Sequence, residues 1–506
     1  MALNEILPVL LELLSQQDED DDEDNWTRSM AAAACLELLA RDVGDDIVQP
    51  VVPFVEAGIR QPEWQHREAA VMAFGCILDG PEPMTLSPLV TQALGALIGM
   101  MQSDPSIQVR DTVAWTLSKI TEVMLQVIDP AVHLESLVTA LINGLGSSPR
   151  IVNSCCSALN NLVSQLSQPD AVEDLATSPM SMYYSGIFKA LMPVSERPNN
   201  DSNSRSAAYQ TIATFISASA VDTLNVVQEV TIAMLARQEQ LLSMHNQLVG
   251  VDDRNNWNDL QINLCVVLQS VVHKSPAMIA PFGDRIMMNL LGLIQSSGKH
   301  AGVLEDAFST IGSLASALEA GFVKYNDAFA PFLFSALTSF EDWQVAQAAV
   351  YVTSDIARAI GQEIAKYAEQ IMVSLLEILR SPVIHRNVKP NAIATIGELA
   401  LAVGPAFIPF LETTMSILSQ AGSTAADATD SAMIEFVWQM REAIVEAFIG
   451  ILNGLKPSNR KSILYALELI CQPLHSKNTS VVSCHSCILV WTRLIGQTPL
   501  LFRHWA

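Results

Sequence analysis

Small and branched apolar residues recur at helical spacing along most of the chain. The segments REAAVMAFGCI (67–77) and RDTVAWTLSKI (110–120) both begin with a charged residue and continue with apolar residues spaced as on one face of a helix. Six further segments share this layout: 152–163, 205–216, 304–315, 346–357, 389–400 and 441–452. The pattern predicts a series of amphipathic helices, one in each repeat.

The spacing between these segments predicts the fold class. Arg67 and Arg110 lie 43 residues apart, and Ala307, Ala349 and Ala392 step by 42 and then 43. Steps near 40 to 47 residues are typical of HEAT or armadillo arrays, in which each unit is a pair of antiparallel helices. We therefore expect an all-α protein, a right-handed α-solenoid or superhelix of about ten HEAT (armadillo-like) repeats over residues 1–456.

In each repeat, a first helix A, a short turn and a second helix B are expected. For helix B at 107–124, one apolar stripe is predicted to be buried: Val109, Val113, Leu117, Ile120 and Met124. Asp111, Trp115 and Ser118 form the opposite stripe, expected to face solvent on the usually concave side where partners bind. Asp104, in the preceding turn, is expected to cap helix B and to pair with an arginine of a neighbouring repeat, or only to cap it.

Charge restricts the class of partner. The 506 residues carry a formal net charge of −25, and residues 457–506 hold a net charge of +4, which leaves −29 for residues 1–456. Direct binding to nucleic acid or to an anionic membrane surface is therefore disfavoured, and basic partners are favoured. The apolar stretch 88–101 is too short to span a membrane, and the N-terminus lacks the basic region of a secretory signal. A soluble intracellular protein is expected.

Candidate chemistry is sparse. Cys471, His475, Cys484 and Cys487 have a spacing that suits zinc, but chance clustering is favoured, so no metal and no cofactor are expected. The other cysteines, in apolar helical stretches, fit reduced core thiols. Gly298-Lys299 lacks the further residues of a phosphate-binding loop, and no hydrolase or metalloprotease motif occurs. No enzymatic activity is predicted.

An acidic run stands out near the N-terminus, followed by Asn25 and Trp26. It consists of Asp18, Glu19, Asp20, Asp21, Asp22, Glu23 and Asp24. Seven adjacent carboxylates repel one another and cannot be buried, so they predict a solvated loop between helices A and B of the first repeat. This loop either keeps the chain soluble or captures a Lys/Arg-rich partner.

Several long segments resemble the importin-beta family of HEAT-repeat nuclear import receptors. They are QQDEDDDEDNW (16–26), REAAVMAFGCILDGPEP (67–83), RDTVAWTLSKI, NDLQINLC (258–265), KYNDAFAPFL (324–333) and IHRNVKPNAIATIGELALAVG (384–404). The resemblance covers residues 5–456. It implies that about the first seven repeats of the family are absent, leaving its C-terminal two-thirds. Residues 457–506 resemble no terminal repeat, and we expect a divergent basic segment with one or two further helices.

The resemblance also implies partners and a site. In the family, helix B residues wrap the basic importin-beta-binding segment of importin-alpha or bind basic cargo, and the small GTPase Ran in its GTP form releases it. Nucleoporin FG repeats are further partners, and the location is the cytoplasm, the nucleus and the nuclear pore. The acidic run and Trp26 are expected to contact partners, together with Glu68, Asp111 and Trp115, the tryptophans packing on the stems and guanidinium groups of the basic segment. Ser157 replaces another such tryptophan. The alternative for Trp115 is core filling.

The sequence therefore predicts a nuclear transport receptor whose acidic surface holds a basic segment. Two alternatives stay open. One is a HEAT scaffold of another class, such as a phosphatase regulatory subunit. The other is a truncated relative that no longer transports, in which the missing repeats weaken Ran binding.

Overall fold

The computed structural model describes residues 2–17, 27–167, 175–197, 202–298, 300–424 and 430–455. Throughout these ranges the regular structure is helical, with short 3-10 turns between helices and no strand. The chain divides into two compact units, residues 1–234 and residues 235–506. The predicted all-α solenoid of paired helices is confirmed.

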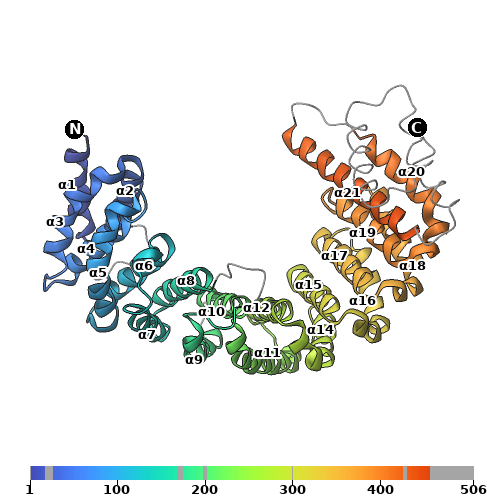
Figure 1. Cartoon of the computed structure of the whole chain (residues 1–506), viewed down its shortest axis with the longest axis horizontal. Coiled ribbons are helices and arrows are strands. Elements are labelled where there is room, and N and C mark those ends of the chain that lie inside the picture. The colour runs from blue at the N-terminus through green and yellow to red at the C-terminus, as the bar shows by residue number, and fades with distance from the viewer. Residues whose placement is uncertain are drawn as a thin grey trace. The chain divides into compact units, whose positions relative to one another are not determined.

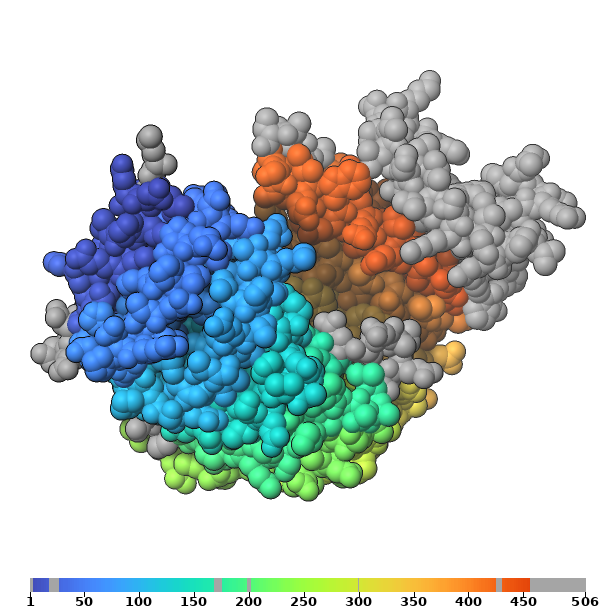
Figure 2. Space-filling view, turned by 60° about the vertical axis from the view of Figure 1, so that its left-hand side comes forward, coloured from blue at the N-terminus to red at the C-terminus, as the bar shows by residue number. Residues whose placement is uncertain are grey.

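In unit 1 the helices alternate between two layers (Figure 1). The A layer contains α1 (Ala2–Leu14), α3 (Val48–Gly58), α5 (Pro83–Ser103), α7 (Leu134–Gly144) and α9 (Tyr184–Ser195). The B layer contains α2 (Arg28–Val43), α4 (Trp64–Cys76), α6 (Ile107–Val123), α8 (Pro149–Leu166) and α10 (Ser202–Ser217). Each B helix packs on its own A helix, and successive B helices of the unit pack on one another. The space-filling view shows these repeats packed in chain order, from blue to green (Figure 2).

Unit 2 continues the same alternation. Its A helices are α14 (Gly283–Ser296), α16 (Asn326–Leu337), α18 (Ala368–Arg380) and α20 (Leu411–Gly422). Its B helices are α12 (Val251–Lys274), α15 (Ala301–Leu318), α17 (Trp343–Ile360), α19 (Val388–Val403) and α21 (Ser431–Leu455). Helix α11 (Leu224–Met244) contains the division between the units, and its second half packs on α12, where the Trp257 indole donates to the Leu241 carbonyl at 2.9 Å. A single turn, α13 (Pro276–Ile279), precedes α14.

Small residues bring neighbouring B helices into close contact. A Cβ added at Gly450 of α21 would lie 2.3 Å from the Gly397 carbonyl of α19, and one added at Gly454 would lie 2.3 Å from the Ala400 carbonyl. Backbone approaches of this kind admit only glycine. The abundance of small residues in the B segments therefore has a packing cause.

The structure confirms the predicted buried stripe of α6 and corrects the stripe that was expected to face solvent. Val109, Val113 and Leu117 are fully buried, as predicted. Ser118, expected to face solvent, is only 8% exposed. The reason is that α6 is flanked by B helices on two sides, α4 and α8, so its buried face is wider than a single stripe.

The turn before α6 links two repeats. Both Asp104 carboxylate oxygens accept hydrogen bonds from the Arg67 guanidinium of α4, at 2.8 and 2.9 Å. The predicted pairing with a neighbouring repeat is confirmed. The predicted cap is wrong, because the Ser106 hydroxyl accepts from the Val109 N–H at 3.3 Å and caps α6, while Asp104 accepts from the Ser106 N–H.

Three helical stretches are long and apolar enough to cross a membrane by length and composition alone: Pro83–Ser103, Pro276–Ser296 and Val388–Gly422. Helix α5 is thus longer than the stretch 88–101 on which the opposite expectation rested. In this structure α5 buries one stripe, including Leu86, Val90 and Leu94, and exposes the other face. That no helix crosses a membrane stays a prediction.

The described cysteines are all free thiols. Cys76, Cys155, Cys156 and Cys265 are buried, and burial raises the pKa of the Cys156 thiol to about 11 and that of the Cys76 thiol to about 12. Their expected role as core thiols is confirmed. Cys35 is exposed and does not belong to the core.

Candidate partner-binding surface

Glu68 of α4 lies inside the helix packing, contrary to the expectation that it faces a partner. The side chain is 4% exposed, and its carboxylate accepts hydrogen bonds from the Thr112 hydroxyl at 2.6 Å and from the Gln17 amide. Burial raises the pKa of Glu68 to about 7, against the lowering effect of these two donors. Glu68 therefore links α4 to α6 and to the segment that follows α1, and it is not included in the binding surface.

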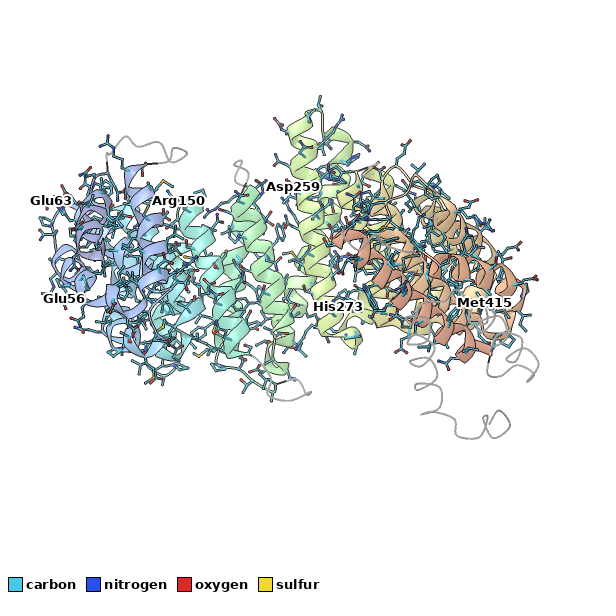
Figure 3. The ribbon with its side chains drawn as sticks, turned by 90° about the horizontal axis from the view of Figure 1, so that it is seen from above. Glu56, Glu63, Arg150, Asp259, His273 and Met415 are labelled. Carbon is cyan, nitrogen blue, oxygen red and sulfur yellow. The ribbon has the colours of Figure 1, made fainter. Side chains whose placement is uncertain are left out.

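Asp111 lies on the accessible side of α6, as expected. Its carboxylate pairs with the Arg150 guanidinium of α8 at 3.2 Å, and the two side chains are 20% and 56% exposed. Arg150 projects from the first turn of α8 (Figure 3). The pair links two neighbouring B helices, and an exposed pair of this kind is weak enough to exchange partners.

Trp115 is half-buried on the same side of α6. Its ring packs on α4 where Gly75 carries no side chain: a Cβ at Gly75 would lie 2.3 Å from the Trp115 Cζ3 atom. The ring thus has a fixed platform and an accessible part. Trp115 therefore partly fills space between helices, as core filling would require, and partly remains accessible to a partner.

Two further residues complete this region, and the sequence analysis missed them. The Lys119 ammonium lies 5.8 Å from the centroid of the Trp115 ring and pairs with the Glu37 carboxylate of α2 at 3.1 Å. Glu37 also pairs with Arg41 at 3.1 Å, and Arg41 bonds Asp79 at 2.8 Å. We name Glu37, Gly75, Trp115 and Lys119 the tryptophan seat. The only sequence signal for it is a glycine inside an apolar helix, which often marks close packing.

Unit 2 has a similar arrangement with different chemistry. A Cβ at Gly312 of α15 would lie 2.5 Å from the Asp355 Oδ2 atom of α17. Asp355 pairs with Arg358 at 3.4 Å, and Arg358 also lies 3.6 Å from Glu398 of α19. Burial raises the pKa of Asp355. We name Gly312, Asp355, Arg358 and Glu398 the aspartate seat.

The remaining predicted site residues lie outside the described ranges: Asp18, Glu19, Asp20, Asp21, Asp22, Glu23, Asp24 and Trp26. Ser157, on α8, is exposed. Within the described ranges, no group of three or more His, Cys, Asp or Glu side chains is placed to hold a metal ion. Cys471, His475, Cys484 and Cys487 also fall outside those ranges.

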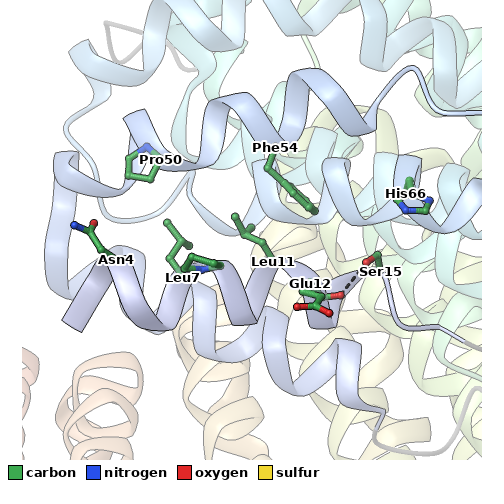
Figure 4. Close-up of a pocket in the computed structure, with 9 residues that line it drawn as sticks. Asn4, Leu7, Leu11, Glu12, Ser15, Pro50, Phe54 and His66 are labelled. Atoms are coloured by element: carbon green, nitrogen blue, oxygen red, sulfur yellow. Dashed lines mark hydrogen bonds between the residues drawn. The ribbon is translucent and has the colours of Figure 1, made fainter. Parts of the chain in front are cut away.

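A groove of about 670 Å³ opens on the A-layer side of unit 1, between α1 and α3 (Figure 4). Apolar side chains dominate its wall, with His66 of α4 at one end. Its lining is Asn4, Leu7, Pro8, Leu11, Glu12, Ser15, Pro50, Phe54 and His66. The groove suits an apolar side chain of a peptide.

Stacked helix pairs whose B layer presents charged and aromatic side chains define a HEAT-repeat solenoid, and a HEAT-like repeat family matches residues 64–120. The family described as importin subunit beta-1-like, TPR repeats, matches residues 136–501. The chain belongs to the importin beta-1-like family. This match corrects the expectation that the resemblance ends near residue 456, and the membership agrees with the absence of enzymatic activity expected from the sequence.

Similar proteins include importin subunit beta-1 of Schizosaccharomyces pombe, which is 42% identical over 479 residues, 94% of this chain and 54% of that protein. A crystal structure of importin beta superposes with a TM-score of 0.89 at 38% identity, covering 98% of this chain and 58% of the other. Two structures of Kap95, one with Nup1 and one with RanGDP, each have a TM-score of 0.79 at 31% identity. Each match covers 94% of this chain and 54% of the Kap95 chain. The chain thus spans about half the length of its relatives.

Proposed function

We propose that this chain acts in nuclear protein import, its B layer holding a basic segment such as that of importin-alpha or of a basic cargo protein. The observation that carries the proposal is the tryptophan seat, where one ammonium group, that of Lys119, lies near both a fixed indole and the carboxylate of Glu37. Asp111 adds a further carboxylate on α6, the helix that carries Trp115. Family membership and the net charge of −25 support the same partner class.

The chemistry of such a surface fits lysine and arginine. The aliphatic stems of these residues pack on an indole, and their charged ends interact with its face and with carboxylates. The acidic run at residues 18–24 would raise the local concentration of the basic segment by long-range attraction. Exposed charges are screened beyond about 8 Å at physiological ionic strength, so binding should weaken as salt rises.

We further propose that Ran in its GTP form releases the basic segment and that the protein moves between cytoplasm and nucleus. The Kap95 structure with RanGDP supports Ran as a partner of this family. The acidic run is proposed to contact Ran as well as the basic segment.

The test uses the full chain and a dye-labelled basic peptide of importin-alpha, with fluorescence anisotropy recorded from low to high salt. We expect affinity to fall with salt and to fall further when Glu19, Asp20, Asp21 and Asp22 are changed to serine. The matched control changes four exposed A-layer glutamates to serine: Glu5, Glu12, Glu56 and Glu135. Salt-independent binding, or equal effects of the two variants, would contradict the proposal, as would capture of phosphatase subunits in place of importin-alpha.

For nucleoporins, we propose that the groove between α1 and α3 accepts phenylalanine side chains of FG repeats. The Kap95 structure with Nup1 supports this partner class, and the apolar lining, including Leu7 and Phe54, supports this place. Phe54→Ser should weaken binding of an FG-repeat peptide. Met182→Ser, at an exposed methionine of the turn before α9, is the control, and equal binding by both variants would argue against the groove.

A further inference from the structure

The tryptophan seat already contains a basic side chain, which belongs to the protein itself. Lys119 lies one helical turn beyond Trp115 on α6, and its ammonium is 5.8 Å from the ring centroid. This is within the range in which a cation is attracted to an aromatic face. The same ammonium is 3.1 Å from the Glu37 Oε1 atom, on a helix two repeats earlier.

Helices α2, α4 and α6 build this arrangement together. The Glu37 carboxylate comes from α2, the glycine platform from α4, and the indole and ammonium from α6. Glu37 Oε1 accepts from both Lys119 and Arg41, at 3.1 Å each. No donor within the described ranges bonds the other oxygen, Oε2, which leaves an acceptor for an incoming N–H group.

Lys119 is the part of the seat that moves most easily. Its side chain is 22% exposed and has a flexible four-carbon stem, whereas the indole packs tightly against Gly75. A partly exposed ion pair contributes little net stability, so a competing cation can displace it at small cost. Arg41 is held differently, because it also bonds Asp79 at 2.8 Å.

We propose that Lys119 is a tethered stand-in for the partner's basic side chain: its ammonium occupies the site between Trp115 and Glu37, and a lysine or arginine of the bound segment takes its place. This inference rests on the proposed binding of a basic segment and names the residues that hold one of its side chains. Only a cationic side chain replaces both contacts of Lys119. A neutral side chain would leave the stand-in where it is, so the exchange adds selectivity for basic segments.

The consequence is a measurable penalty on binding. The incoming side chain must break the Lys119–Glu37 pair before it forms its own contact. The Lys119 and Glu37 side chains are 22% and 27% exposed, and breaking a partly exposed pair costs on the order of 1 kcal/mol, which corresponds to roughly a fivefold change in affinity. Removing the stand-in should therefore tighten binding of a basic segment by about two- to fivefold, although the variant loses one positive charge.

The test compares Lys119→Met with Lys189→Met. Lys189 lies on α9 in the A layer, is exposed, and forms no ion pair with any described residue. Both variants lower the net charge by one, so general attraction of a basic peptide changes equally in both. We expect the tightening in Lys119→Met to exceed that in Lys189→Met by about two- to fivefold, measured by anisotropy with the basic importin-alpha peptide. A peptide of equal length with glutamine at the basic positions should not separate the variants.

Other outcomes decide against the inference. Equal tightening in both variants would show only a general charge effect, and weaker binding by Lys119→Met would show that the lysine supports the seat. Glu37→Gln removes the anion but keeps the shape, so this variant should bind the peptide more weakly. Adding Lys119→Met to Glu37→Gln should then give no further tightening. If the parent chain does not bind the peptide, the proposed function fails. In that case a gain of binding by Lys119→Met alone still supports the stand-in, and no gain overturns it.

Discussion

The tryptophan seat of unit 1 and the aspartate seat of unit 2 use one backbone arrangement for different chemistry. In both, a glycine on one B helix makes room for a side chain on the next, at Gly75 for Trp115 and at Gly312 for Asp355. In both, a basic residue one turn later pairs with a glutamate of another B helix. The difference shows that the repeat fixes where a side chain is presented, while the residue at that position decides what it can bind.

One ion pair between repeats in each unit shows a second contrast. The Arg67–Asp104 pair of unit 1 is largely buried, with side chains 13% and 6% exposed. The Lys324–Asp284 pair of unit 2 is exposed, at 59% and 78%. Two residues of opposite charge one repeat apart are thus a rigid internal link in one unit and a surface contact in the other.

Breaking these pairs should give the largest effect. Arg67→Met leaves the Asp104 carboxylate buried without its partner, and we expect a loss of about 3 kcal/mol or more in the free energy of unfolding. Lys324→Met should cost less than about 1 kcal/mol, because solvent replaces the lysine. Urea unfolding of both variants measures this. Equal losses would show that burial does not distinguish the two pairs.

The next effect concerns the glycines. A methyl group at Gly75 meets the rigid indole of Trp115, so Gly75→Ala should destabilise unit 1 by about 1 to 3 kcal/mol and weaken binding of the basic peptide. At Gly312 the methyl group meets the end of the Asp355 side chain, which can turn away, so Gly312→Ala should cost less than about 1 kcal/mol. Thermal unfolding of the two variants checks the order, and a larger loss at Gly312 would reverse the comparison.

Buried carboxylates give a pH-dependent effect. The pKa of Glu68 is raised to about 7, so the folded state holds the proton more tightly than the unfolded state, where the value is near 4.5. This contribution is fully present below about pH 4.5 and is lost as pH rises towards 7. Between pH 5 and pH 8 we expect a loss of about 2 to 3 kcal/mol, absent in Glu68→Gln.

Asp306 of unit 2 is the natural comparison for Glu68. Burial, and then the neighbouring charge of Glu305, raises the pKa of Asp306 to about 6, and the side chain is more accessible to solvent. Asp306→Asn should therefore reduce the pH dependence by less than Glu68→Gln does. Chemical unfolding at several pH values measures both, and an unchanged pH profile in Glu68→Gln would show that another group dominates.

The sequence predicted those features that depend on spacing within one helix or between adjacent repeats. The buried stripe of Val109, Val113 and Leu117 follows from helical periodicity. Pairing of Asp104 with an arginine of a neighbouring repeat was one of two predicted roles, and the structure identifies that arginine as Arg67. Glu68 was expected to contact a partner, as the family resemblance implied. Its burial depends on donors from α6 and from the segment that follows α1, which no local pattern reveals.

The tryptophan seat was only half predicted for a similar reason. Trp115 was identified on its own helix, but Gly75 and Glu37 lie 40 and 78 residues away, on other repeats. Their contact depends on the rotation of each B helix against the next, and this rotation is set by the packing of small residues. A sequence period of 43 residues defines the order of the helices and not the register of their faces.

The smallest expected effect is on peptide affinity, when the central side chain of either seat, Trp115 or Asp355, is replaced. A cation and an indole interact by about 0.5 to 1 kcal/mol at exposed sites, so Trp115→Ala should weaken binding of the basic peptide by about two- to fivefold. The loss should persist at high salt, because packing of the lysine stem on the ring is not screened. At the aspartate seat, Asp355→Asn removes a charge, so any loss of affinity should disappear at high salt. A salt titration of both variants decides the question: parallel curves would mean that the glycine-seated residues act alike, and that the exchange of tryptophan for aspartate has no consequence for recognition.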